Sequence, residues 1–174
     1  ISAFHTATAP VSGVDWPHAS ARIADENLRD IEDQPTVFDP ASLSAHAVNR
    51  KRVHEAARET LTRQSAAVRH CHGDLHLRNA FVEHGRPILF DCIEFDDFYA
   101  NIPPLYDLAF LIMDLCARGL AEHANRALNA WLMDQPPPRW HGLLEDLAAL
   151  PAYLTWRAEI RAKTEGRKPG AADA

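Results

Sequence analysis

Cysteine is scarce in this sequence, and the few cysteines present do not suggest pairs. The three residues, Cys71, Cys92 and Cys116, are odd in number, widely spaced and without a Cys-x-x-Cys motif. Such a set does not support a disulfide framework and is typical of reduced thiols in a cytosolic protein. We therefore expect a cytoplasmic location.

Long apolar runs and an excess of basic residues are also missing. No apolar run approaches the roughly 20 residues that cross a bilayer. No basic-then-apolar signal segment opens the chain. The formal net charge of −6 gives no support for nucleic-acid binding, which favours a basic face. We expect neither a membrane nor a nucleic acid among the partners.

What is present fits one ordinary domain. The 174 residues can bury a real core, and the hydrophobic fraction of 47% and charged fraction of 24% are typical of globular proteins. The chain begins with Ile1 rather than Met. We therefore expect it to be a piece of a longer protein.

Apolar periodicity predicts a mostly helical α+β domain with one β-hairpin near its middle. Residues 1–17 show little periodicity and are expected to form a loop. Gly119 is expected to end the apolar helix, three consecutive prolines to end the next one, and Pro151 to kink the last one. The expected helices are His18–Asp33, Ala41–Arg69, Leu105–Gly119, Leu120–Asp134 and Gly142–Glu165, and the expected strands are Ala80–Glu83 and Pro87–Asp91, joined by His84-Gly85-Arg86.

Polar residues gather at the entrance and exit of that hairpin, in HCHGDLHLRNAFVEHGRPILFDCIEF (residues 70–95). Transfer of a phosphoryl group to a hydroxyl needs one carboxylate to orient the acceptor and oxygen ligands to hold Mg²⁺. Protein kinases supply these with His-x-Asp-Leu-x-x-x-Asn and an aspartate after a short hairpin. Here Asp74 and Asn79 have that spacing, and Asp91 follows the apolar run Ile-Leu-Phe. The pattern favours phosphoryl transfer over a hairpin with incidental polar residues.

The motif HGDLHLRN with the following FDCIEF resembles the aminoglycoside phosphotransferase and choline kinase family, which has a protein-kinase-like fold. That family carries Gly where protein kinases carry Arg after the first histidine. PLYDLAFLIMDL resembles the family helix that follows the metal-binding aspartate. LPAYLTWRAEIRAKT resembles the last helix of a bacterial subgroup in which such a domain is often joined to a P-loop ATPase-like domain.

The resemblance implies a role for each matching residue. Asp74 would be the catalytic carboxylate, and His76 would contact phosphate or fix Asp74. Asn79 and Asp91 would hold Mg²⁺ against the phosphates of ATP or GTP. The supporting residues would be His72, which braces the loop, Asp107, which anchors the loop backbone or pairs with its own helix dipole, and Glu94, as a further metal or supporting ligand.

The resemblance also implies an organisation for the chain. Residues 1–174 would form the C-terminal lobe of a kinase-like fold, with a catalytic loop at 70–79, a hairpin at 80–91 and a helical subdomain at 103–165. No Gly-rich phosphate loop and no Val-Ala-Ile-Lys-like strand are found. The N-terminal nucleotide-binding lobe would therefore be absent from this chain, and that lobe or a fused P-loop domain would be its partner. The acceptor would be a small molecule with a hydroxyl group.

Two alternatives remain open at the level of sequence. One is a catalytically silent kinase-like module that binds or regulates a partner. The other is a zinc-stabilised structural domain, because Cys71 with His70, His72 and His76 are residue types that bind zinc. Arg157, Arg161 and Lys163 recur at near-helical spacing and are expected to form a solvated face.

Overall fold

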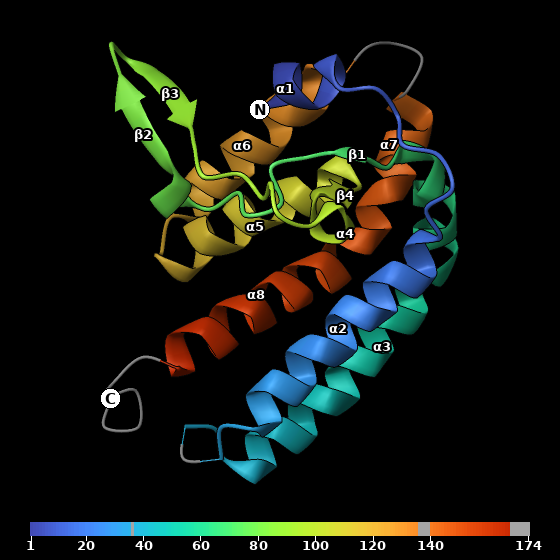
Figure 1. Cartoon of the computed structure of the whole chain (residues 1–174), viewed down its shortest axis with the longest axis vertical. Helices are drawn as coiled ribbons and strands as arrows, with labels where there is room; N and C mark the ends of the chain where they lie inside the picture. The colour runs from blue at the N-terminus through green and yellow to red at the C-terminus, as the bar shows by residue number, and fades with distance from the viewer. Residues whose placement is uncertain (36, 136–139, 168–174) are drawn as a thin grey trace.

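Helices supply most of the fold, which confirms the predicted mostly helical α+β class (Figure 1). This computed structural model describes residues 1–35, 37–135 and 140–167. None of the described helices is both long and apolar enough to cross a membrane. The helices are α1 (Ser2–Ala7), α2 (Trp16–Glu32), α3 (Pro40–Gln64), α4 (Asp97–Ala100), α5 (Pro104–Ala117), α6 (Ala121–Met133), α7 (Trp140–Asp146) and α8 (Leu150–Gly166).

The long helices α2 and α3 lie side by side and run in opposite directions (Figure 1). Each begins at an aspartate whose side chain accepts a backbone N–H of the first turn: Asp15 from His18 at 3.2 Å and Asp39 from Ser42 at 2.9 Å. A proline lies in the first turn of both helices, where its missing N–H costs nothing. These caps explain why both helices begin slightly before the predicted positions.

An aromatic cluster forms the centre of the core, where α2, α5 and α8 meet. Trp16, Tyr106, Tyr153 and Trp156 are at most 1% exposed. The Trp16 and Tyr106 ring centroids lie 5.1 Å apart, as do those of Tyr106 and Tyr153. The Trp16 indole N–H donates to the Tyr153 hydroxyl at 2.7 Å. The cluster therefore fixes α8 against α2 and α5, which becomes important for the site.

A two-residue ladder closes the polar segment at its base. β1 (Arg69–His70) pairs antiparallel with β4 (Asn101–Ile102), and the Cys71 N–H donates to the Ala100 carbonyl at 2.8 Å. The predicted long helix consequently ends at Gln64 rather than Arg69, because the next residues form a 3-10 turn (η1, Ser65–Ala67) and then enter β1. The segment 71–100 thus leaves the helical core and returns to it at the same place, because β1 and β4 pair at its two ends.

The predicted hairpin exists, with a tighter loop than expected. β2 (Ala80–Glu83) pairs with β3 (Arg86–Leu89), and Glu83 lies opposite Arg86. Only His84 and Gly85 connect the strands, with φ of 50° and 76°. Two residues with positive φ match the twist of a hairpin, and glycine adopts such angles without strain. The hairpin projects from the helices, and Asp91 follows the end of β3 (Figure 1).

Two predictions about helices were wrong. The segment 1–17 contains α1, which is too short to show apolar periodicity and carries the buried His5. The last helix is not continuous: α7 is followed by a 3-10 turn (η3, Leu147–Ala149), and Pro151 lies in the first turn of α8. In the first turn of a helix the N–H that proline lacks has no intrahelical partner, so Pro151 begins α8 without kinking it. The prolines 136–138 lie outside the described residues.

Schellman-type bonds end α5 as predicted. Gly119, at φ 74°, donates to the Cys116 carbonyl at 3.0 Å, and Leu120 donates to the Leu115 carbonyl at 2.9 Å.

Burial along α3 predicts a sharp contrast between its two faces. Leu61 is 1% exposed within the core, whereas Val48 on the same helix is 72% exposed. Leu61→Ala should lower the free energy of unfolding by about 3 kcal/mol, because it removes buried methyl groups and leaves a cavity. Val48→Ala should change it by less than about 0.5 kcal/mol. Urea denaturation of both variants measures the difference, and equal effects would contradict the described orientation of α3.

Candidate functional site

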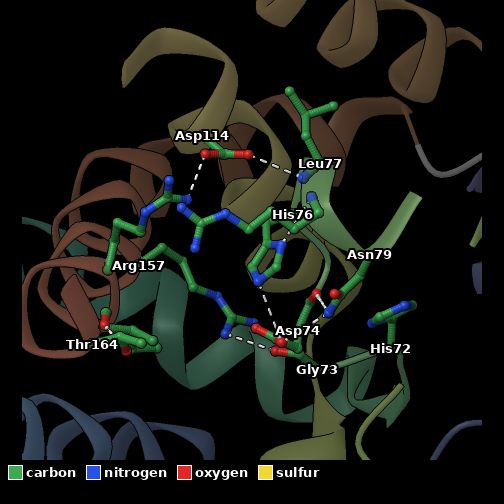
Figure 2. Close-up of polar contacts among 12 residues, drawn as sticks. His72, Gly73, Asp74, His76, Leu77, Asn79, Asp114, Arg157 and Thr164 are labelled. Carbon is green, nitrogen blue, oxygen red and sulfur yellow. Dashed lines mark hydrogen bonds and ion pairs between the residues drawn. The ribbon is translucent and has the colours of Figure 1, made fainter. Parts of the chain in front are cut away.

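Two side chains of the predicted catalytic loop, Asn79 and His76, contact the carboxylate of Asp74. The Asn79 amide nitrogen donates to the Asp74 side chain at 2.9 Å and to the Asp74 backbone carbonyl at 3.0 Å. His76 Nε2 lies 3.4 Å from the same carboxylate oxygen of Asp74. Figure 2 shows Asn79 and His76 on either side of Asp74. The amide oxygen of Asn79, the atom that a metal would need, takes no part in these bonds.

The orientation of His76 is fixed by its neighbours. Its Nδ1 accepts the Arg78 backbone N–H at 3.2 Å, so in the neutral ring the hydrogen is on Nε2 and faces Asp74. The ring also meets the Phe110 ring edge-on, with centroids 5.2 Å apart. His76 therefore presents a donor to Asp74 in a single orientation.

Asp74 is held in its ionised form. Burial alone would raise the pKa of this carboxyl group. The hydrogen bond and charge of His76, the Asn79 amide and the charge of Arg157 together outweigh burial, and the pKa lies below its ordinary value. Asp74 is thus an anion at neutral pH that can accept a hydrogen bond from a hydroxyl group.

Asp74, Asp91 and Glu94 line one recess of about 570 Å³. Asp91 has a φ of 59°, in the left-handed region that only a few residue types with a side chain adopt. Such backbone strain is common at functional sites. The Glu94 carboxylate accepts a hydrogen bond from the Cys92 thiol at 3.7 Å. Carboxylate oxygens are ligands that Mg²⁺ prefers, so the residue types that line this recess suit the ion, whereas Asn79 is not among them.

Gly73 and His72 join the catalytic loop to the segment that carries Asp91. Gly73 has a φ of +80°, and a Cβ there would lie 2.8 Å from the Ile93 side chain, so only glycine fits. The His72 ring lies 2.9 Å from the Phe90 carbonyl through Nε2, which must therefore carry hydrogen. The Ile93 N–H donates to the His72 carbonyl at 2.9 Å. These contacts fix the position of Asp91 relative to Asp74.

Asp107 on α5 binds the backbone of the catalytic loop. It accepts the His72 N–H at 3.1 Å and the Gly73 N–H at 2.9 Å. The carboxylate oxygen that accepts the His72 N–H also lies 3.0 Å from His5 Nε2. The Trp131 indole N–H, a donor only, lies 3.0 Å from His5 Nδ1, so Nδ1 accepts and Nε2 donates to Asp107. A chain of hydrogen bonds thus runs from α6 through α1 and α5 to the loop.

The charge of Asp107 is stabilised although the residue is fully buried. Burial alone would raise the pKa of Asp107. The hydrogen bond and electrostatic interaction with His5, the charge of Arg157 and the Gly73 N–H together outweigh burial, so the pKa of Asp107 lies below its ordinary value. The loop is therefore bound to a buried anion.

A second buried aspartate on the same face of α5 holds the other half of the loop. Asp114, two helical turns beyond Asp107, accepts the Leu77 N–H at 3.0 Å (Figure 2). Arg161 of α8 lies 2.6 Å from its carboxylate and Arg118 3.2 Å away. Burial opposes its charge, but the Leu77 N–H and the two arginines outweigh burial and lower the pKa of Asp114. Sequence reasoning missed Asp114, although two acids spaced at seven residues in an apolar helix were a signal.

The predicted solvated face of α8 is wrong. Arg157 is 3% exposed, and it donates to the Gly73 carbonyl at 2.9 Å and to the Tyr106 carbonyl at 3.1 Å. Its guanidinium carbon lies 3.8 Å from the centroid of the Tyr106 ring. Arg161 pairs with Asp114, and Lys163 lies 2.8 Å from Asp30 of α2. These cations attach α8 to the catalytic loop, α5 and α2.

The zinc alternative gains no support from the described residues. His70, Cys71, His72 and His76 have separate partners, and the Cys71 thiol donates to the Ile102 carbonyl at 3.3 Å. Another set of possible zinc ligands, His5, Cys71 and Asp107, is more compact, because its ligand atoms all lie within 4.8 Å of one another. Both ring nitrogens of His5 are already hydrogen-bonded, and burial raises the pKa of Cys71 far above its ordinary value. A neutral thiol is a poor zinc ligand.

Comparison with known proteins gives a family and distant relatives of unassigned activity. The sequence model described as "Phosphotransferase enzyme family" matches residues 1–150. Uncharacterized proteins of Mycobacterium bovis and of two strains of Mycobacterium tuberculosis are each 33% identical over 112 residues, which cover 59% of this chain. The match covers 21% of those relatives, so the chain spans about a fifth of their length. No solved structure matches the chain.

The hydrogen-bonded chain through His5 predicts a specific rescue. His5→Phe leaves the Trp131 N–H unpaired and removes a donor from the buried Asp107, and should lower the free energy of unfolding by about 3 kcal/mol. His5→Gln should recover part of the loss, because its amide offers one donor and one acceptor. His123→Phe, on the exposed face of α6, is the control and should have little effect. Equal destabilisation by Phe and Gln, measured in urea, would count against the network.

The lowered pKa values of Asp107 and Asp114 predict an acid-sensitive fold. Their stabilisation is complete above the unfolded-state pKa, near 3.8, and is lost as pH falls through the lower folded-state values. Asp114→Asn should cost about 2–3 kcal/mol at neutral pH. It should also flatten the decline in stability between about pH 5 and about pH 2. Unfolding by urea at each pH measures both effects, and parallel curves for the two proteins would refute this assignment.

Proposed function

The chain belongs to the phosphotransferase enzyme family, and from this premise we propose that it carries the catalytic loop of a Mg²⁺-dependent kinase of small molecules. The reaction moves the γ-phosphoryl group of ATP or GTP to a hydroxyl group of the acceptor. The observation that carries the proposal is the position of Asp74: an ionised carboxylate, oriented by Asn79 and His76, in the same recess as Asp91.

Asp74 would act on the acceptor hydroxyl. The transition state of phosphoryl transfer is loose, so positioning contributes more than strong base catalysis. A carboxylate with a lowered pKa suits this task, because it accepts a hydrogen bond from the hydroxyl throughout the neutral pH range. The acceptor oxygen forms a bond to the γ-phosphorus while the bond from that phosphorus to the leaving ADP or GDP breaks. The hydroxyl proton passes to Asp74.

Asp91 and Asn79 would hold the metal, with Glu94 beside them. Bound Mg²⁺ would neutralise charge on the phosphates and the leaving group. The residues themselves contribute fixed oxygen atoms: Asp91 is placed by the contacts of His72 and Ile93, and Asn79 by its two bonds to Asp74.

The nucleotide would also need contacts from a partner domain, either an N-terminal kinase lobe or a fused P-loop domain. Large apolar side chains near the recess support a covering partner. Phe95, which lines the recess, is 85% exposed, and Phe90, next to Asp91, is 45% exposed and packs its ring against that of Phe81, which is 47% exposed. An exposed apolar group of this kind is typical of surfaces that another domain covers.

Substitution in the complete protein tests the assignment. Asp74→Asn and Asp91→Ala should each lower kcat by at least about 10²-fold while the thermal melting curve stays close to wild type. Consumption of ATP is measured in the presence of a panel of hydroxyl-bearing metabolites. Asp97→Asn is the control, because this acid is exposed and is not among the residues that line the recess. Wild-type turnover by either site variant would refute the roles given to these residues.

Calorimetry with Mg²⁺ and a non-hydrolysable ATP analogue separates this proposal from a catalytically silent module. The enzyme should bind the analogue, and Asp91→Ala should weaken that binding. A complete protein that binds no nucleotide would instead be a silent module.

A further inference from the structure

Helix α8 contacts the catalytic loop at two places that lie one helical turn apart on the helix. Arg157 donates to the Gly73 carbonyl in the first half of the loop. Arg161 lies 2.6 Å from the Asp114 carboxylate, which accepts the Leu77 N–H at 3.0 Å in the second half (Figure 2). Residues at i and i+4 lie on the same face of a helix, so one face of α8 serves both halves of the loop.

The Leu77 N–H begins the turn that brings two side chains to Asp74. This turn is the 3-10 helix η2 (Leu77–Asn79), which directly follows His76. The Asn79 N–H donates to the His76 carbonyl at 3.0 Å, so the two ends of the turn are tied together. The side chains of His76 and Asn79 contact the Asp74 carboxylate at 3.4 Å and 2.9 Å. A displacement of η2 would therefore change both contacts with that carboxylate at once.

The bond from Leu77 to Asp114 depends on the cations that compensate the charge of this fully buried carboxylate. Arg118 lies 3.2 Å away at the end of the same helix, and its side chain is 39% exposed. Arg161 is closer, at 2.6 Å, is 23% exposed and comes from another helix. A buried carboxylate that loses its closest cation takes up a proton or a water molecule, and either change weakens the bond to Leu77.

A second link joins Arg161 to the same turn. Arg161 Nε lies 3.2 Å from a carboxylate oxygen of Glu165, and Arg78 Nη2, which belongs to η2, lies 2.9 Å from that same oxygen. The Arg161 guanidinium thus lies between two carboxylates that each contact η2. Asp114 contacts its backbone, and Glu165 contacts one of its side chains. The pair of Arg78 and Glu165 is partly exposed and contributes less than the buried link.

We propose that Arg161 is a positioning residue of the candidate site. Through Asp114 it holds η2, and η2 in turn determines how its neighbouring side chains meet Asp74. The first half of the loop, at Gly73, is held by a different arginine and does not depend on Arg161. An effect of Arg161 on turnover rests on the proposed phosphotransferase function, whereas its effect on the position of η2 does not.

Amide hydrogen exchange of the chain at neutral pH, followed by NMR without nucleotide or metal, tests the position of η2. Arg161→Met keeps an unbranched side chain and removes its charge. The Leu77 N–H should exchange faster in this variant, because the turn opens locally. The Gly73 N–H, which is bonded to Asp107, is the internal reference. The ratio of the Leu77 rate to the Gly73 rate should rise at least about 10-fold, whereas a loss of overall stability alone would raise both rates alike.

Lys163→Met is the matched control. Lys163 lies on the same helix, pairs with Asp30 of α2 at 2.8 Å, and its side chain is 20% exposed, close to the 23% of Arg161. This variant removes a comparable ion pair and should leave the ratio of exchange rates unchanged. Arg161→Lys should restore part of the wild-type ratio, because one ammonium group can pair with Asp114 but cannot also reach Glu165.

Kinetics of the complete protein test the consequence for the reaction. Arg161→Met should lower kcat for ATP consumption at least about 10-fold, because a displaced turn misplaces the groups around Asp74. Lys163→Met should keep the wild-type kcat. An unchanged exchange ratio in Arg161→Met, an equal rise in Lys163→Met, or a wild-type kcat in Arg161→Met would overturn the proposal. A raised exchange ratio in a protein that phosphorylates no acceptor would support the role of Arg161 in holding η2 and refute the phosphotransferase reaction alone.

Discussion

The bond between the Asp107 carboxylate and two successive backbone N–H groups is the interaction on which the rest of the site depends. Backbone amides at His72 and Gly73 are held by one buried anion, and the positive φ of Gly73 turns the chain so that Asp74 comes next. Charge-assisted bonds of this kind are short and strong in a low-dielectric interior. The first residues of the catalytic loop are therefore positioned by a side chain of α5.

Three helices distant in sequence serve this anchor. α1 contributes His5, α6 contributes Trp131, and α8 contributes Arg157, which holds the Gly73 carbonyl while Asp107 holds the Gly73 N–H. One peptide unit on each side of Gly73 is thus fixed by groups of opposite charge. The aromatic cluster is part of the same arrangement. It packs α8 against α5 and so fixes the position along α8 from which Arg157 contacts the loop.

The sequence predicted what depends on local pattern. The hairpin follows from apolar runs around a glycine, α5 from its apolar composition, and the family from the motif around Asp74, whereas the roles of Asp74, Asn79 and Asp91 stay predictions. Sequence analysis failed where contacts between residues far apart in the chain determine the structure. His5 lies in a six-residue helix without periodicity, and its partner is 102 positions away. Arg157 is a charged residue at helical spacing, and only the packed structure reveals the carbonyls that justify its burial.

The closed base of the segment 71–100 separates the hairpin tip from the chemistry. β1 pairs with β4, and the Phe90 N–H donates to the Asn79 carbonyl at 3.1 Å just below the hairpin. No described contact of the site crosses the tip at His84 and Gly85, and a Cβ at Gly85 would meet open space. Exposed tips of this kind accept insertions readily. The tip residues His84 and Gly85 are therefore a permissive position for a short peptide tag, because an insertion there leaves the contacts of residues 72–79 unchanged.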